Sequence, residues 1–201
     1  MSRSGRLVAL LAVALTLAVD HASAQDRRGF TFGFGGGWGS ANAECDDCGN
    51  GDREDSGAGY FKAGYALSPR VIVGFEANVW SKTYDLPGLE ATSTVNMYNV
   101  SGTVTYYPQA TGGFFVKGGG GGGFLNLEIK ESGSTLSADM GKGPGFIAGA
   151  GYDIPLGRRV ALTPAVNYWY GRMGNLRVLG ETFATGWRQN VIDVTIGLTF
   201  P

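Results

Sequence analysis

The sequence predicts an all-β protein, an eight-stranded antiparallel up-and-down transmembrane β-barrel with short periplasmic turns and long extracellular loops. Three observations lead to this fold class. Eight segments alternate in side-chain character with a period of two, their connections alternate between short and long, and one face of the segments is apolar with aromatic residues near both ends. A period of two is that of a β-strand, whose successive side chains point to opposite faces of the sheet. An even strand number is what an up-and-down barrel requires.

The eight segments have the length of tilted strands that cross a membrane, about 9–11 residues, with a few more at their ends. In the last segment, for example, Ile192, Val194 and Ile196 alternate with Asp193 and Thr195. The predicted strands are Gly29–Gly39, Ala58–Ser68, Val71–Lys82, Val95–Tyr107, Gly113–Asn126, Lys142–Ile154, Arg159–Gly171 and Trp187–Phe200.

The connections between these segments form two classes. Short ones cover Ser68–Arg70, Pro108–Gly112 and Pro155–Arg158, and each contains a proline. Longer polar stretches, rich in glycine, serine, asparagine and charge, cover Ser40–Gly57, Thr83–Thr94, Leu127–Gly141 and Arg172–Gly186. Short periplasmic turns and longer extracellular loops are typical of outer-membrane barrels.

The aromatic residues on the apolar face favour a membrane barrel over a water-soluble one, because they gather at two levels. One level, near the short turns, holds Phe30, Tyr65, Tyr106, Phe114, Tyr152 and Phe200. The other holds Trp38, Phe61, Tyr98, Phe146, Tyr168 and Tyr170. Two such girdles mark the two membrane interfaces. The alternation by itself also fits a soluble periplasmic ligand-binding barrel, which stays open as an alternative.

The N-terminal residues have the order of a secretory signal. Arg3 and Arg6 precede an apolar run from Leu7 to Val19, and Ala22-Ser23-Ala24 follows it. We expect cleavage after Ala24, so that residues 1–24 are the signal peptide and residues 25–201 the barrel domain. The formal net charge of −1 and the lack of a basic stripe argue against a nucleic-acid partner.

These features together resemble the small eight-stranded outer-membrane barrel superfamily, which includes the OmpA-like transmembrane domain, OmpX-like proteins and opacity-type proteins. The resemblance rests on the signal sequence, the eight segments, the turn asymmetry and the last strand. It implies that Gly197, Leu198 and Phe200 belong to an assembly signal read by the barrel-assembly machinery, although Pro201 follows the aromatic residue. It also implies a location in the outer membrane, with membrane lipid and lipopolysaccharide as neighbours.

Six charged residues fall on the polar face and are expected to point into the barrel lumen as a charge network: Lys62, Glu76, Lys117, Asp153, Arg159 and Asp193. An eight-stranded barrel is only wide enough for side chains to fill its interior. We therefore expect Glu76 and Asp193 to be compensated mainly by Lys62 and Lys117. The alternative is a narrow path for ions or small solutes, lined by the same four residues.

Cys45 and Cys48 lie in an acidic stretch and are expected to form a local disulfide after export. A weaker hypothesis is loose divalent-cation binding by the carboxylates around them, Asp46, Asp47, Asp52, Glu54 and Asp55. The run Gly118–Gly123 lacks a following helix, so it predicts a bare patch on a strand, where side chains of other strands can cross the lumen, and not a phosphate loop.

The only histidine, His21, lies within the expected signal peptide. Outer-membrane barrel enzymes resemble one another in their reliance on histidine, so no enzymatic activity and no cofactor are expected. The leading interpretation is a membrane anchor whose loops form a structural or adhesive surface with an unknown extracellular partner. A narrow passive pore remains the second interpretation.

Overall fold

The computed structural model describes residues 27–46, 48–86, 91–131, 134–178 and 181–201, and the expected signal peptide lies outside these ranges. Within them, no helix is long and apolar enough to cross a membrane. The long strands are β1 (Gly29–Cys45), β3 (Glu54–Ser68), β4 (Val71–Leu86), β5 (Ala91–Tyr106), β6 (Phe114–Glu131), β7 (Ser134–Tyr152), β9 (Ala161–Val178) and β10 (Glu181–Phe200). Two short strands, β2 (Gly49–Asn50) and β8 (Ile154–Pro155), pair with β1 and β9.

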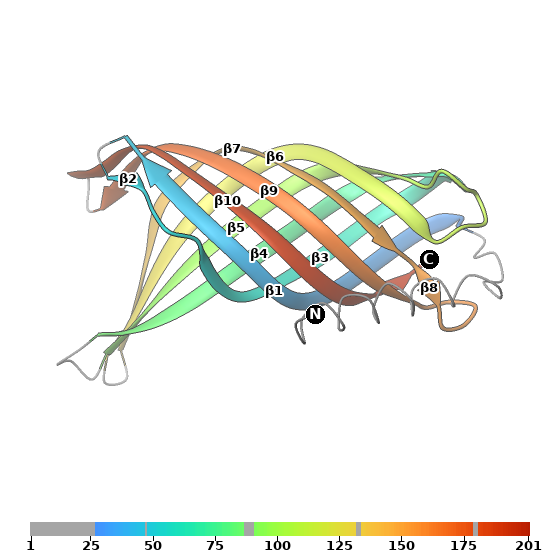
Figure 1. Cartoon of the computed structure of the whole chain (residues 1–201), viewed down its shortest axis with the longest axis horizontal. Coiled ribbons are helices and arrows are strands. Elements are labelled where there is room, and N and C mark those ends of the chain that lie inside the picture. The colour runs from blue at the N-terminus through green and yellow to red at the C-terminus, as the bar shows by residue number, and fades with distance from the viewer. Residues whose placement is uncertain (1–26, 47, 87–90, 132–133, 179–180) are drawn as a thin grey trace, which may run out of the picture.

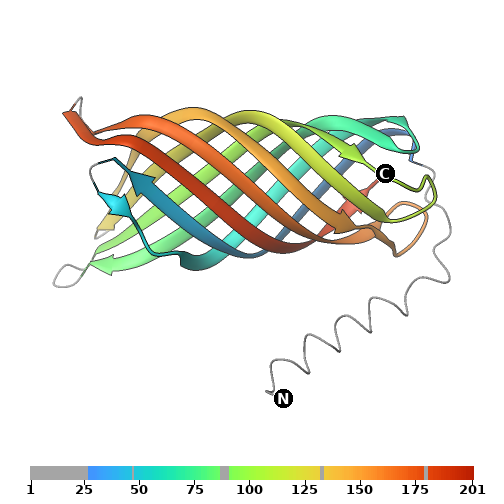
Figure 2. The same cartoon turned by 45° about the horizontal axis from the view of Figure 1, so that its top comes forward.

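Each long strand is antiparallel to the strands beside it, and β10 pairs with both β9 and β1, so the sheet closes on itself (Figures 1 and 2). The closing seam has Phe32 opposite Phe200, and their rings stack with centroids 4.7 Å apart. The predicted all-β, eight-stranded antiparallel barrel is thus confirmed.

The two ends of the barrel differ. At one end, called here the turn end, the strands are joined by short connections, and the predicted strand limits agree with the observed ones within two residues. At the other, the hairpin end, the strands run four to eight residues beyond their predicted limits. Most of the residues expected in long loops therefore belong to strands.

At the hairpin end the barrel wall divides into two lobes (Figure 1). Pairing between β7 and β9 stops at Gly145 and Gly171, and pairing between β3 and β4 stops at Gly57 and Ser81. One lobe is made of β9, β10, β1 and β3, and the other of β4, β5, β6 and β7.

Part-way along most of the long strands, the apolar residues change from the outward to the inward positions. In β10, Ile192, Val194 and Ile196 face outward and are exposed, whereas two positions nearer the hairpin end the outward residue is Asn190 and the inward one is Val191. The same change occurs in β5, β4, β6 and β1 at nearly one level. The wall therefore has an apolar outer band near the turn end, and polar outer walls with an apolar interior near the hairpin end.

The interior of the hairpin-end half is an apolar core of buried side chains. Its members come from both lobes: Ala41, Cys45, Trp80, Met97, Leu125, Ile147, Trp169, Met173, Leu176, Ala184 and Val191. A wall surrounded by water on its outside needs such a core, because apolar burial is its main source of stability. The strands extend in this half because their inward residues pack into this core.

Two glycines with positive φ lie where β9 and β10 lose their regular register. Gly174 (φ 72°) is opposite Trp187, and Gly186 (φ 62°) directly precedes Trp187. The register shifts on both sides of Trp187, toward Ala184 and toward Arg188. Glycine accepts this backbone conformation without strain, so the two strands can bulge and stay paired.

We predict that Trp80→Ala destabilises the barrel far more than Trp38→Ala. Trp80 is 1% exposed and its indole N–H donates to the Gly39 carbonyl at 3.0 Å, whereas Trp38 is 73% exposed on the outer wall. Loss of a buried Trp costs about 3–5 kcal/mol, and loss of an exposed one about 1 kcal/mol or less. Urea unfolding in lipid vesicles measures both free energies of unfolding, and equal losses would contradict an apolar core inside the lumen.

Candidate functional site

The centre of the lumen holds a buried ion pair. The Lys117 ammonium on β6 donates to both carboxylate oxygens of Glu76 on β4, at 2.6 and 2.7 Å, and the two side chains are 4% and 2% exposed. The pair lies over the inner face of β5, the strand between β4 and β6. Its charges neutralise each other at hydrogen-bond distance, and the Lys117 ammonium also lies 5.7 Å from the ring centre of Tyr60 on β3, so side chains of three strands meet at this level of the lumen.

Lys62 is opposite Glu76 in the register of β3 and β4, yet it forms no ion pair with any described residue. Its ammonium group lies 5.3 Å from the ring centre of Phe115 instead. This arrangement differs from the expectation that both lysines compensate the carboxylates, because Lys117, two strands away on β6, donates to both oxygens of Glu76.

Asp193 is held by neutral donors and not by a lysine. It accepts hydrogen bonds from the side-chain amide of Asn167 at 2.6 Å and from the indole N–H of Trp169 at 2.9 Å. Both donors lie on β9, the neighbour of β10. Asp193 is therefore stabilised by side chains of the adjacent strand, and not by Lys62 or Lys117 as expected from the sequence.

A second buried group closes the turn end of the lumen. Asp153 accepts from the Tyr107 hydroxyl and from the Thr163 hydroxyl, each at 2.7 Å. The Arg27 guanidinium lies 3.6 Å from the centre of the Tyr107 ring and donates to the carbonyls of Ala110 and Gly112 at 3.2 and 2.6 Å. Arg27 is only 4% exposed, so its side chain fills this end of the lumen.

Arg159 does not belong to the lumen, contrary to the sequence-based expectation. It is exposed in the connection 156–160, and β9 begins only at Ala161. The sequence-based assignment extends the alternation of a strand to Arg159. Arg159 lies in a turn, where successive side chains do not alternate between two faces.

Lumen glycines make room for the large polar side chains. A Cβ on Gly35 would lie 2.7 Å from the Tyr60 ring, and one on Gly197 would overlap the Tyr60 hydroxyl. In the same way, a Cβ on Gly149 would lie 3.0 Å from the Lys117 side chain. Gly197, expected in an assembly signal, thus has a packing role, while Leu198 and Phe200 face outward. The assembly role itself stays a prediction.

The space left inside the turn-end half of the lumen is small. One cavity of about 30 Å³ lies beside Lys62, Glu76 and Thr103, and another of about 10 Å³ lies beside Arg27 and Asp153. On this measure, which counts the space open to the centre of a water molecule, about 10–15 Å³ is enough for one water. These cavities can hold isolated waters, and they are far too small for a continuous aqueous path.

The hairpin end contains a larger recess of about 520 Å³, formed between the two lobes. Apolar residues form its floor, namely Ala41, Trp80, Val95, Met97 and Trp187, and Asp52, Glu54 and Tyr84 lie at its rim. The Tyr84 hydroxyl donates to Glu54, and burial together with this carboxylate raises the pKa of Tyr84. The sequence does not predict this site, because half of these residues, Ala41, Asp52, Glu54 and Tyr84, fall in segments expected to be loops.

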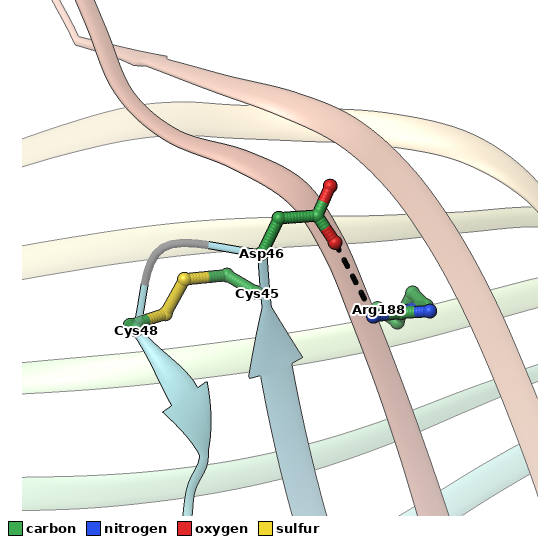
Figure 3. The surroundings of a disulfide bond; sticks show 4 residues. All are labelled: Cys45, Asp46, Cys48 and Arg188. Atoms are coloured by element: carbon green, nitrogen blue, oxygen red, sulfur yellow. Dashed lines mark hydrogen bonds and ion pairs between the residues drawn. A yellow bond between two sulfur atoms is a disulfide. The ribbon is translucent and has the colours of Figure 1, made fainter.

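A disulfide joins Cys45 and Cys48 beside the recess (Figure 3). Next to it, Asp46 accepts a hydrogen bond from the Arg188 guanidinium on β10 at 3.3 Å, which ties the β1–β2 hairpin to its neighbour. Among the described residues, which exclude Asp47, no group of three or more His, Cys, Asp or Glu side chains is placed to hold a metal ion.

Comparison with protein families decides what kind of barrel this is. Residues 9–200 match the family described as outer membrane protein beta-barrel domain. The chain belongs to this family. It is therefore located in the cell outer membrane, and the alternative of a soluble periplasmic barrel is not supported. The turn end faces the periplasm and the hairpin end faces the cell exterior.

Solved structures show the same fold at low sequence identity. Ail, the attachment invasion locus protein of Yersinia pestis, in complex with the heparin analogue sucrose octasulfate, matches at 12% identity and a TM-score of 0.53, covering 86% of this chain and 99% of that one. Neisserial surface protein A matches at 14% identity and a TM-score of 0.53, covering 85% and 96%. No curated protein sequence matches the chain.

We predict that Glu76→Ala lowers the free energy of unfolding by about 3–5 kcal/mol, because it leaves the Lys117 ammonium buried without its partner. The double variant Glu76→Leu/Lys117→Met should recover most of this loss, since it removes both charges. The matched control is Glu128→Ala, which breaks an ion pair with the exposed Lys130 and should cost about 1 kcal/mol or less. A small cost for Glu76→Ala would indicate that water fills the lumen.

Proposed function

We propose that this protein is a closed, non-enzymatic anchor of the outer membrane, which presents two strand lobes and the recess between them as a contact surface to the cell exterior. The observation that carries the proposal is the filling of the lumen at three successive levels. From the periplasm outward these are the Arg27–Tyr107–Asp153 group, the Glu76–Lys117 ion pair and the apolar core.

The levels differ in chemistry, and each hinders the passage of ions. The first two hold charges that are already paired or hydrogen-bonded, so an ion gains little by entering. The third is apolar and offers an ion no compensation for its hydration. Arg27, Lys62 and Lys117 also balance Glu76, Asp153 and Asp193 in number, as expected of an interior that is closed to counter-ions.

The contact surface is supported by the amount of ordered structure that lies outside the membrane. The strands extend beyond the apolar band, carry a disulfide-bonded hairpin and enclose the 520 Å³ recess with its apolar floor. A concave site with an apolar lining and a few polar groups at its rim is typical of ligand binding. The fold likeness to Ail and Neisserial surface protein A is consistent with a surface role, and the partner of this chain stays undefined.

We predict that the refolded protein gives no single-channel currents in planar lipid bilayers at either polarity, because no level of the lumen is open. Each sample is checked for folding by its faster migration in unheated than in boiled detergent gels, so a silent bilayer cannot result from misfolded protein. Discrete, reproducible conductance steps from folded protein would contradict the closed anchor and favour the narrow passive pore lined by Lys62, Glu76, Lys117 and Asp193.

A further inference from the structure

The recess between the two lobes has an acidic rim and an aromatic lining. Of the described residues that line it, only Asp52 and Glu54 carry charge, and both are acidic. Trp80, Tyr84 and Trp187 present aromatic rings to the same space. A charged group that enters the recess is therefore attracted if it is positive and repelled if it is negative.

Acidic residues also outnumber basic ones in the chain around this rim, which covers the described residues of 44–57 and 82–86. Its acidic residues are Glu44, Asp46, Asp52, Glu54, Asp55 and Asp85. The basic residues that belong to it or contact it are already engaged: Lys82 with Glu54 at 3.6 Å, Arg53 with Asn190 at 2.9 Å and Arg188 with Asp46 at 3.3 Å. Lys142 and Arg172 are exposed on the outer wall of β7 and β9 and do not line the recess. The rim therefore keeps a negative charge after every nearby cation is counted.

Lys82 shows how this rim holds a cation. Its ammonium group lies 3.6 Å from the Glu54 carboxylate and 5.4 Å from the centre of the Tyr84 ring, and a carboxylate and an aromatic face both attract positive charge. The recess also contains these two kinds of group without a cation. Asp52 is exposed and forms no ion pair or hydrogen bond with a described residue, and no described cation lies over the half-buried ring of Trp187. These two side chains are open to a cation that the chain does not itself supply.

The floor of the recess selects for an apolar body on that cation. Ala41, Val95, Met97 and Trp80 form the floor, and the volume of about 520 Å³ is in the range of sites that enclose a small organic molecule. Apolar surface placed on this floor is removed from water, and the flexible thioether of Met97 can adapt to its shape. A strongly hydrated inorganic ion would gain nothing from such a floor.

We propose that the recess binds a small amphipathic organic cation, an ammonium or guanidinium group carried on an aromatic or aliphatic body. The cationic group contacts the Asp52 carboxylate and the face of Trp187, and the apolar body covers Trp80 and Met97. The inference rests on the proposed function, since it names the class of ligand for the contact surface at the cell exterior. Because the lumen below is filled, the ligand is held in the recess and does not pass through the barrel.

The test compares three water-soluble probes of similar size: the cation 2-phenylethylammonium, the neutral 2-phenylethanol and the anion 3-phenylpropanoate. Their dissociation constants are measured by saturation-transfer NMR titration of the full mature protein in phosphatidylcholine nanodiscs, with empty nanodiscs as the blank. We expect the cation to bind about 10-fold more tightly than the alcohol, as for one hydrogen bond to a charged group. The anion should show no binding above the blank.

Two variants separate the contributions of charge and apolar contact. Asp52→Asn should weaken binding of the cation about 10-fold and leave binding of the alcohol unchanged. Trp187→Leu should weaken binding of both probes, and that of the cation more, because it removes an aromatic face. Faster migration of unheated than of boiled protein in detergent gels checks that each variant is folded.

The matched control is Asp55→Asn, which removes the same charge three residues away, from an exposed position on the outer wall opposite Ser40. At about 0.15 M salt it should change binding of the cation less than about 2-fold, because exposed charges that make no contact are largely screened. Equal weakening by Asp52→Asn and Asp55→Asn, equal affinity for the cation and the alcohol, or no binding of the cation by folded protein would overturn the site. None of these results concerns the closed lumen, which only conductance contradicts, so failure of this inference and failure of the anchor are distinguishable.

Discussion

The change of solvent along the outer wall, from hydrocarbon to water, is the constraint on which the rest of this structure depends. Within the membrane band every outward residue must be apolar, and the backbone must satisfy its hydrogen bonds within a closed sheet. Beyond the band the outward residues must be polar, and the barrel can be stabilised only by apolar side chains inside it. The β5 strand shows both parts, since Tyr98 and Val100 face lipid whereas Val95 and Met97 face the interior beyond the boundary. One continuous strand thus serves two solvents with opposite patterns.

The filled lumen follows from the same constraint. Inward positions within the membrane band are free of lipid and are mostly polar or glycine, apart from a small apolar cluster of Tyr107, Phe115 and Ala165. Eight strands leave no space for a hydrated channel once their side chains meet. Tyr60 and Lys117 fit only because Gly35, Gly149 and Gly197 have no side chains. Of the buried charges, Glu76 and Lys117 are paired, Asp193 and Asp153 are hydrogen-bonded, and Lys62 lies against the Phe115 ring. Beyond the boundary, the apolar core fills the rest of the lumen. The lumen is therefore closed because each half of the barrel is stabilised by side chains packed inside it.

The sequence allows the membrane-embedded half to be predicted well, because a period of two and proline-containing turns depend only on local residues. The inward positions of Glu76, Lys117 and Asp193, and the Cys45–Cys48 disulfide, follow in the same way. The pairing of Glu76 with Lys117 over the intervening strand could not be predicted, since it depends on the shear of the closed barrel. The outer half was predicted as loops because its segments are rich in Ser, Thr and Asn. Its strands could be found from the alternation Thr94-Val95-Asn96-Met97, which keeps the period but inverts the apolar phase.

The central claim is that the environment of the outer wall changes from lipid to water at one sharp level. It is tested most directly by spin labels at the outward positions 188, 190, 192, 194 and 196 of β10, in a Cys45→Ser/Cys48→Ser background reconstituted in lipid vesicles. The account predicts that labels at 192, 194 and 196 collide more with oxygen dissolved in lipid, and that labels at 188 and 190 collide more with a water-soluble nickel reagent. Water access at all five positions, or lipid access extending to 188, would contradict it.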